Sequence, residues 1–270
     1  MAGRESMRNR RDNFTPSGVN QADNKRRSNQ NLNKAILGYG IPNFVGIVFF
    51  IISLVYAVHL TENFLPQSKP AVTTPKDEFS AERASKHLFD ITKLGPRTSG
   101  SYANDISAVK VLVQAIQEIK KSANKDFNVE IDVQTGAEGT FAFVRSGIVD
   151  IGYTIVYNNI TNVVAKVSKK SSKSQSSPYI LVNAHFDSVP NTEGASDDTV
   201  SCAVMLETMR AITHTKNKDI DNGFIFLFNG AEEGPLAGSH AFIMNHKWKD
   251  LPKVVVNLEA AGSGISSNFD

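Results

Sequence analysis

The stretch YILVNAHFDSVPNTEGASDDTVSC, residues 179–202, places a histidine and several acidic residues directly after a short apolar run. The run at residues 180–182 predicts a buried strand, because short continuous apolar segments suit strands that are covered on both faces. That strand leads directly to His185 and Asp187, and the triplet SDD follows in a loop of small residues. The neighbouring elements indicate what these polar groups do at the end of a buried strand.

Strands and helices alternate after this stretch. We expect a helix at about residues 198–213, a strand at 223–229, a helix at about 236–245 and a strand at 253–259. Apolar strands that alternate with helices predict an α/β fold with a mixed, largely parallel sheet covered on both faces. A chain of 270 residues with 41% hydrophobic residues is large enough to bury the core of such a fold.

The preceding part of the chain is expected to add two helices and three strands. Apolar residues follow a helical spacing over residues 80–93 and about 102–122, and NVEIDVQT at 128–135 alternates as a half-buried strand. The segment 147–167 is interpreted as two strands that meet at a polar turn, residues 158–162.

An uncharged apolar segment lies before these elements. Residues 36–60, ILGYGIPNFVGIVFFIISLVYAVHL, contain no Asp, Glu, Lys or Arg, and about 20 such residues are enough to cross a bilayer. We predict an uncleaved transmembrane signal-anchor helix at residues 35–60, embedded in the lipid bilayer. A cleaved signal peptide and a buried core helix are the alternatives, and the length of the apolar run favours the membrane span.

Basic residues crowd the N-terminal side of this segment, and no Lys or Arg follows it before Lys69. The positive-inside rule then places the N-terminus in the cytosol and everything after Leu60 on the lumenal side. The NIT sequence at Asn159 is a glycosylation acceptor on that side. The expected organisation is a basic disordered cytosolic tail at 1–34, the span at 35–60, a proline-rich lumenal stalk at 61–79 and a folded domain at 80–270.

Charge and cysteine content exclude some classes of protein. The net charge is only +2, and neither charge nor aromatic placement supports a nucleic-acid-binding module. Cys202 is the only cysteine, so no intrachain disulfide can form and the domain must be stable through its core.

Acidic and imidazole side chains follow each of the three strands expected to be parallel. Because the carboxyl ends of parallel strands meet at one edge of a sheet, these groups should converge there. They are His185 and Asp187, Asp197 and Asp198, Glu232 and Glu233, and Glu259. Carboxylates at one edge repel one another, and a divalent metal cation would remove that cost. Taken singly, each has a structural alternative: a strand-end histidine, a helix N-cap in the SDD triplet, or a solvated glutamate pair.

Three segments carry a resemblance to a known family. HFDSV with GASDDTVSCAVMLE, FNGAEEGPLAGSHAF and NLEAAGSG resemble the zinc-binding segments of the M28 aminopeptidase family, and LGPRTSGSYAN resembles an upstream segment of the same family. The resemblance covers roughly residues 80–270. It implies a three-layer α/β zinc-exopeptidase fold, peptide or protein substrates and a membrane-anchored branch resident in the endoplasmic reticulum membrane.

The resemblance also implies a ligand set for two Zn²⁺ ions. His185 is similar in position to a ligand of one zinc, Asp197 to the carboxylate that bridges both ions, and Glu233 to a ligand of the second. Glu259 stands where many relatives carry aspartate as a ligand of the zinc that His185 binds. Nitrogen and oxygen ligands of this kind suit zinc.

Two further residues receive roles from the resemblance. Glu232 matches the general base that takes a proton from the attacking water and passes it to the leaving amine. Asp187 resembles the carboxylate that orients the imidazole of the histidine ligand. The implied activity is a zinc-dependent exopeptidase of aminopeptidase type on the lumenal side of the membrane.

One departure from the family pattern qualifies this assignment. The family carries a further histidine ligand downstream, and none of the later histidines here fits that role by its order in the chain. We therefore expect this chain to be an N-terminal fragment in which the C-terminal part of the domain and one metal ligand are missing, so that the fragment alone would be inactive. Two alternatives stay open: a non-catalytic receptor or interaction domain on the same fold, and a single-zinc acyltransferase of glutaminyl-cyclase type.

Overall fold

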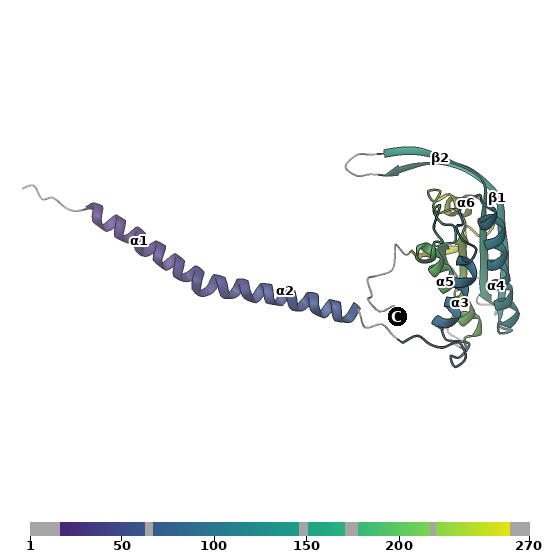
Figure 1. The fold of residues 1–270 in the computed structure, drawn as a ribbon, viewed down its shortest axis with the longest axis horizontal. Helices are drawn as coiled ribbons and strands as arrows, with labels where there is room; N and C mark the ends of the chain where they lie inside the picture. The colour runs from purple at the N-terminus through teal and green to yellow at the C-terminus, as the bar shows by residue number, and fades with distance from the viewer. Residues whose placement is uncertain (1–16, 63–66, 146–150, 171–177, 217–219, 260–270) are drawn as a thin grey trace, which may run out of the picture. The chain divides into compact units, whose positions relative to one another are not determined.

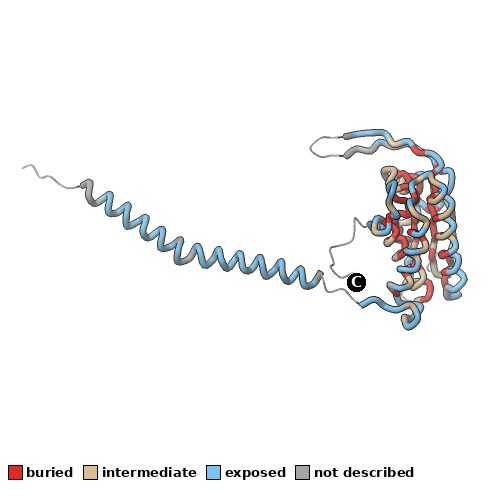
Figure 2. Tube along the Cα trace, in the orientation of Figure 1, coloured by how far each residue is buried: buried red, intermediate tan, exposed pale blue. Residues whose placement is uncertain are grey.

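The structure is a computed structural model that describes residues 17–62, 67–145, 151–170, 178–216 and 220–259. The chain divides into two compact units, residues 1–66 and 67–270, each described by itself (Figure 1). The second unit holds the sheet and nearly all of the buried residues (Figure 2).

The first unit is helical. Helix α1 (Ser17–Ala35) is followed by a π-helical turn at Ile36–Gly40 and by helix α2 (Ile41–Glu62). Within the described residues α2 is the one helix long and apolar enough to cross a membrane, with a mean hydropathy of 2.3 over Ile41–Thr61. Residues 17–34 of the segment predicted as a disordered tail form helix α1 in the structure, and this helix contains no proline. The rest of that tail lies outside the described residues.

The second unit is built on one five-stranded mixed sheet in the order β1-β2-β4-β3-β5. Strands β3, β4 and β5 are parallel, whereas β1 and β2 pair antiparallel and β2 pairs antiparallel with β4. The strands are β1 (Phe127–Arg145), β2 (Ile151–Lys169), β3 (Tyr179–His185), β4 (Gly223–Asn229) and β5 (Pro252–Asn257). Strand β4 has the predicted bounds, and the mixed α/β sheet confirms the predicted fold class.

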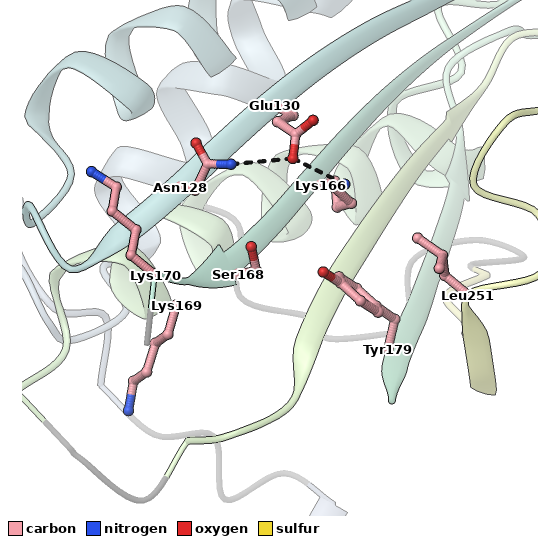
Figure 3. Close-up of a pocket in the computed structure, with 8 residues that line it drawn as sticks. All are labelled: Asn128, Glu130, Lys166, Ser168, Lys169, Lys170, Tyr179 and Leu251. Atoms are coloured by element: carbon pink, nitrogen blue, oxygen red, sulfur yellow. Dashed lines mark hydrogen bonds and ion pairs between the residues drawn. The ribbon is translucent and has the colours of Figure 1, made fainter. Parts of the chain in front are cut away.

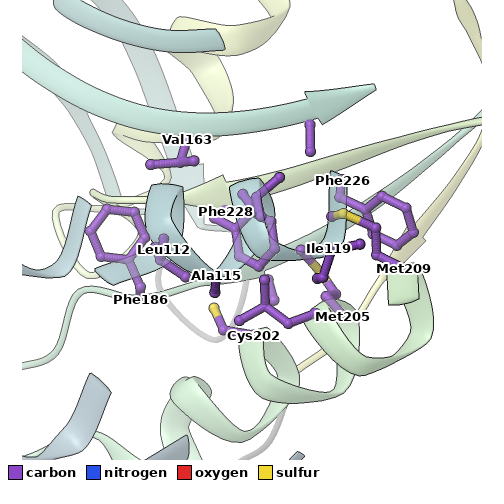
Figure 4. Packing of buried hydrophobic residues seen from close by; sticks show 14 of the residues in the cluster. Leu112, Ala115, Ile119, Val163, Phe186, Cys202, Met205, Met209, Phe226 and Phe228 are labelled. Atoms are coloured by element: carbon purple, nitrogen blue, oxygen red, sulfur yellow. The ribbon is translucent and has the colours of Figure 1, made fainter. Parts of the chain in front are cut away.

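Helices cover both faces of this sheet. One face packs against α3 (Ala81–Thr92), α4 (Val109–Ser122) and α5 (Val200–His214) in the main core, which includes Phe226 and Phe228 of β4 (Figure 4). The residues of β4 that alternate with these, Ile225 and Leu227, pack on the other side with Phe242 of α6 (Ala237–Asn245). The sheet is therefore the middle of three layers, as the alternation of strands and helices predicts.

From residue 151 onward, the segment expected to form two strands and a turn is part of one long strand, and residues 147–150 lie outside the described residues. Strand β2 runs through residues 158–162 and stays paired with β1, with register shifts between Gln134 and Gly139. The polar residues that read as a turn form a bulge in β2, where Asn159 has a φ of 61°. Asn159 is exposed at this bulge.

The segment predicted as a stalk is instead bound to the folded domain from residue 67 onward. Arg83 and Arg210 donate hydrogen bonds to its backbone carbonyls, those of Ala71, Thr74, Pro75, Lys76 and Glu78. The buried carboxylate of Glu207 accepts from both guanidinium groups and from the Ser80 N–H. Proline content predicts an extended segment, but Arg210, one of the two arginines that hold it, is more than 130 residues away in the sequence.

Candidate functional site

Three side chains converge at the carboxyl ends of β3 and β5. His185 is the last residue of β3, Asp197 lies in the turn before α5, and Glu259 follows β5. Nε2 of His185 lies 3.1 Å from Asp197 Oδ1 and 3.3 Å from Glu259 Oε1. One ligand atom from each residue lies within 4.8 Å of the other two, a spacing that could hold a metal ion. The histidine is buried and the two carboxylates are exposed, so the group opens to solvent.

The buried carboxylate of Asp187 lies behind this histidine. Its Oδ1 is 3.3 Å from His185 Nδ1, on the opposite side of the imidazole from Asp197, and the backbone carbonyl oxygen of Asp187 lies 3.1 Å from the same nitrogen. The same carboxylate accepts the backbone N–H groups of Glu232 and Glu233, at 3.0 and 3.1 Å. Asp187 therefore connects the end of β3 to the loop after β4. The other ring nitrogen of His185, Nε2, faces Asp197 and Glu259.

The two glutamates after β4 lie at different distances from the histidine. Glu232 Oε2 is 3.9 Å from His185 Nε2, next to the group of three. Glu233 does not belong to that group, but the charge of Asp197 is among the causes that raise the pKa of the Glu233 carboxyl, after burial. The structure thus brings His185, Asp197, Glu259 and Glu232 together, with Glu233 at the side of Asp197.

The third aspartate, Asp198, is fully buried and accepts the backbone N–H of His185 at 3.2 Å. The peptide bond between Asp197 and Asp198 is cis. Helix α5 has Thr199 at its N-cap position without a side-chain capping bond, so the SDD triplet is not an ordinary helix cap. The helix N-cap, which was the structural alternative for this triplet, is therefore wrong.

The pKa shifts show what this crowding of charge favours. Burial raises the pKa of Asp198 to about 6, and burial followed by neighbouring acids raises the pKa of Glu232. Burial disfavours the charged imidazole of His185, but Asp187, Glu232 and Asp198 outweigh it and raise its pKa to about 10. The neighbouring acids disfavour further negative charge on one another, and they favour positive charge on the imidazole. A cation next to these groups is therefore favoured.

A pocket of about 260 Å³ adjoins the group and shares Glu232 and Glu259 with it. Its remaining lining consists of Asn183, Asn229, Leu236, Ser239, Val255 and Asn257. A lining of polar and apolar residues next to a candidate metal-binding group is suited to a substrate.

A second pocket of about 410 Å³ lies at the other end of β3, beside its first residue Tyr179 (Figure 3). An ion pair between Lys166 and Glu130, with Nζ and Oε1 2.9 Å apart, lies on its wall. The other lining residues are Asn128, Ser168, Lys169, Lys170 and Leu251. This lining includes no histidine and a single acid, so the pocket lacks the features of the site at the carboxyl ends.

The sequence did not single out Arg97, which the structure places beside the site. Its side chain is fully buried and donates to Phe186 O, 2.8 Å away, next to the histidine. The sequence signal was the segment LGPRTSGS after α3, where an arginine follows Gly95 and Pro96 in an otherwise small and polar loop.

Comparisons with known proteins agree with this arrangement. Residues 162–269 match the model of peptidase family M28. A mouse protein named endoplasmic reticulum metallopeptidase 1 is 43% identical over 187 residues, which are 69% of this chain and 20% of that relative. A vacuolar membrane protease of Eremothecium gossypii is 26% identical over 240 residues, 86% of this chain and 22% of that protein. The chain thus spans about a fifth of the length of these curated relatives.

A solved structure shares the fold. The zinc aminopeptidase BSAP from Bacillus subtilis superposes with a TM-score of 0.51 and 16% identity, covering 70% of this chain and 71% of that one. At this identity the likeness shows the fold alone. The family model covers β4 and β5 and the acidic group at their carboxyl ends, and the sheet is that of a known aminopeptidase fold. Residues 162–269 of this chain therefore belong to peptidase family M28.

Proposed function

We propose that the chain is part of a membrane-anchored, zinc-dependent exopeptidase that hydrolyses the first peptide bond of peptides, on the lumenal side of its membrane. The observation that carries this proposal is the geometry of His185, whose Nε2 faces Asp197 and Glu259 while its Nδ1 faces the buried Asp187. An imidazole oriented by a carboxylate is the usual form of a histidine metal ligand. Membership of an M28 peptidase family supports peptide substrates.

The residues of the group fit zinc. His185, Asp197 and Glu259 supply one nitrogen and two oxygen donors within 4.8 Å of one another, and zinc accepts both donor types. Glu233, beside Asp197, would hold a second ion together with that aspartate. A zinc ion bound here would supply a Lewis acid that polarises the substrate carbonyl.

The side chain of Glu232 is placed to move the proton. It lies 3.9 Å from His185 Nε2, and burial with the nearby acids raises its pKa toward the range of an effective general base. Glu232 would take the proton of the attacking water and deliver it to the leaving amine. The adjoining pocket, with Leu236 and Val255 in its walls, would receive part of the substrate.

The membrane placement is part of the same proposal. Helix α2 has the length and composition of a span, and basic residues precede it. One curated relative is named for the endoplasmic reticulum and another for the vacuolar membrane; at 43% against 26% identity we propose the endoplasmic reticulum membrane. The N-terminus would then be cytosolic and the domain lumenal, with exposed Asn159 available for glycosylation.

The test identifies which products the natural full-length protein forms from short peptides. Release of free amino acids from short peptides is expected, with no pyroglutamate from peptides that begin with glutamine. Glu232→Gln should lower kcat by about 10²–10⁴-fold while bound zinc stays at the wild-type level. Pyroglutamate formation would replace the peptidase by an acyltransferase, and zinc binding without any turnover would favour the non-catalytic receptor.

A further inference from the structure

We propose that Arg97 is a positioning residue for the metal centre, and that it holds the segment 186–199, here called the metal loop, in the shape that binds zinc. The inference rests on the proposed function, because it concerns how the ligands of that zinc are placed. The metal loop begins after His185 and carries Asp197, so it connects two of the three groups that face one another.

Arg97 contacts both ends of the metal loop. Its Nε donates to Phe186 O at 2.8 Å, and its backbone N–H and carbonyl exchange hydrogen bonds of 3.0 Å with the hydroxyl and backbone N–H of Ser188. At the other end, Nη2 donates to Glu193 O and to the Thr199 hydroxyl, each at 2.7 Å. A single planar guanidinium thus fixes where the loop leaves β3 and where it returns to α5.

The burial of this arginine argues against an incidental contact. Its side chain is fully buried, and its hydrogen-bond acceptors are carbonyls and a hydroxyl, which carry no charge to neutralise it. Burial lowers the pKa of Arg97, and the negative charges of Asp187 and Glu193 oppose that shift. A buried guanidinium is costly unless nearby acids compensate, and Asp187 is the acid that lies behind the His185 imidazole.

The loop is packed closely around the guanidinium. Gly194 has a φ of 53°, and a Cβ at this position would lie 2.7 Å from Ser188 Cβ and 3.3 Å from Arg97 Nη2. The neighbouring backbone carries Asp197, whose Oδ1 comes within 3.1 Å of His185 Nε2 although the two residues are twelve apart in the sequence. A loop held in this way does not have to lose its freedom when the metal binds, which increases affinity.

The side chain of Thr199 allows the role of Arg97 to be tested without removing the arginine. Thr199 occupies the N-cap position of α5 but makes no capping bond, because its hydroxyl accepts from Arg97 instead. Thr199→Val keeps the shape and removes that acceptor. Thr213→Val is its matched control: Thr213 is equally buried in α5 and its hydroxyl bonds only within the helix, to Arg210 O.

The experiment measures the zinc dissociation constant of the natural full-length protein by competition with a chelator of known affinity. The variants are Arg97→Lys, Thr199→Val and the controls Thr213→Val and Arg83→Lys, and the thermal midpoint of each zinc-free protein is measured in parallel. Lysine keeps the charge but cannot span both ends of the loop. We expect the dissociation constant to rise about 10-fold or more for Arg97→Lys and several-fold for Thr199→Val. The controls should stay within twofold of wild type, even where the thermal midpoint falls.

Two results separate failure of this inference from failure of the proposed function. If the wild-type protein binds zinc and both Arg97→Lys and Thr199→Val bind it within twofold of wild type, Arg97 only stabilises the fold. If the wild-type protein binds no zinc, or binds zinc that Asp197→Ala does not remove, the proposed function is wrong. Should Arg97→Lys fail to fold, Thr199→Val against Thr213→Val decides the question.

Discussion

Replacing Asp187 by asparagine tests how His185, the proposed histidine ligand, is held. The Asp187 carboxylate is fully buried and faces three donors: the N–H groups of Glu232 and Glu233 and the Nδ1 side of the His185 imidazole. Asparagine has nearly the same shape but offers one oxygen and one NH₂ group. At least one of the three donors must then face an NH₂ group, and the negative charge behind the imidazole disappears.

The expected size of the effect follows from these contacts. Each hydrogen bond to a charged group contributes about 1.5–3 kcal/mol, and two of the three donors belong to the loop that carries Glu232 and Glu233. Loss of the carboxylate also lowers the basicity of His185 as a ligand. Changes to such partners of metal ligands weaken metal binding by about 10–100-fold, which is about 1.4–2.7 kcal/mol. We expect Asp187→Asn to weaken zinc binding by this factor.

The assay is chelator competition at fixed pH on the purified, zinc-loaded protein. Asp132→Asn is the matched control, because Asp132 also pairs with a histidine, His246, with Oδ2 and Nε2 2.9 Å apart, but contacts none of the proposed ligands. The control should bind zinc as the wild type does. Zinc affinity of Asp187→Asn within threefold of wild type would refute the reasoning that Asp187 prepares His185 for the metal.

Three further outcomes can be checked independently. Burial opposes the charged form of Glu207, but hydrogen bonds from two arginines and the Ser80 N–H lower the pKa of its carboxyl below the usual value. The stabilising contribution of this carboxylate is therefore present above pH about 4.5 and is lost as the pH falls through the folded-state pKa. Glu207→Gln should accordingly flatten the fall of the thermal midpoint with acid, and an unchanged slope would count against this. Gly238→Ala should destabilise the protein by about 1–3 kcal/mol in urea unfolding, because its Cβ would overlap Asn229 Oδ1, and a wild-type midpoint would contradict it. Asn159→Gln should abolish a glycosidase-sensitive mass shift on gel electrophoresis; a shift that persists would exclude this acceptor.

Most of the sheet could be predicted because its signals are local. The apolar run of β4 lies between polar segments, and its predicted and observed bounds agree. The bulge in β2 could not be recognised, since the three asparagines within residues 158–162 favour a turn as much as a bulge. The choice depends on pairing with β1, which continues on both sides of Asn159.

A long-range contact explains why the stalk prediction failed. Residues 67–79 read as a stalk from their prolines, yet Arg210 binds the backbone carbonyls of Lys76 and Glu78 from more than 130 positions away. Composition describes what a segment can do alone, and residues 67–79 adopt a structure that a distant arginine helps to determine. The polar helix α1 has no apolar periodicity, and no contact with a distant segment accounts for it.

The acidic group was predictable for a topological reason. Parallel strands end at the same edge, so residues that follow β3, β4 and β5 meet although they are scattered from 185 to 259. Arg97 was not predictable in the same way. Three of its four side-chain hydrogen bonds go to backbone carbonyls, which every sequence supplies and no pattern marks.

The central claim is that His185, Asp197 and Glu259 bind zinc. Diffraction from crystals grown with zinc, recorded on both sides of the zinc absorption edge, locates the ion directly. The account predicts an anomalous peak at bonding distance, about 2.0–2.2 Å, from His185 Nε2 and a carboxylate oxygen of Asp197. The absence of a peak at that position, in a crystal with the domain folded and zinc in excess, would contradict the account.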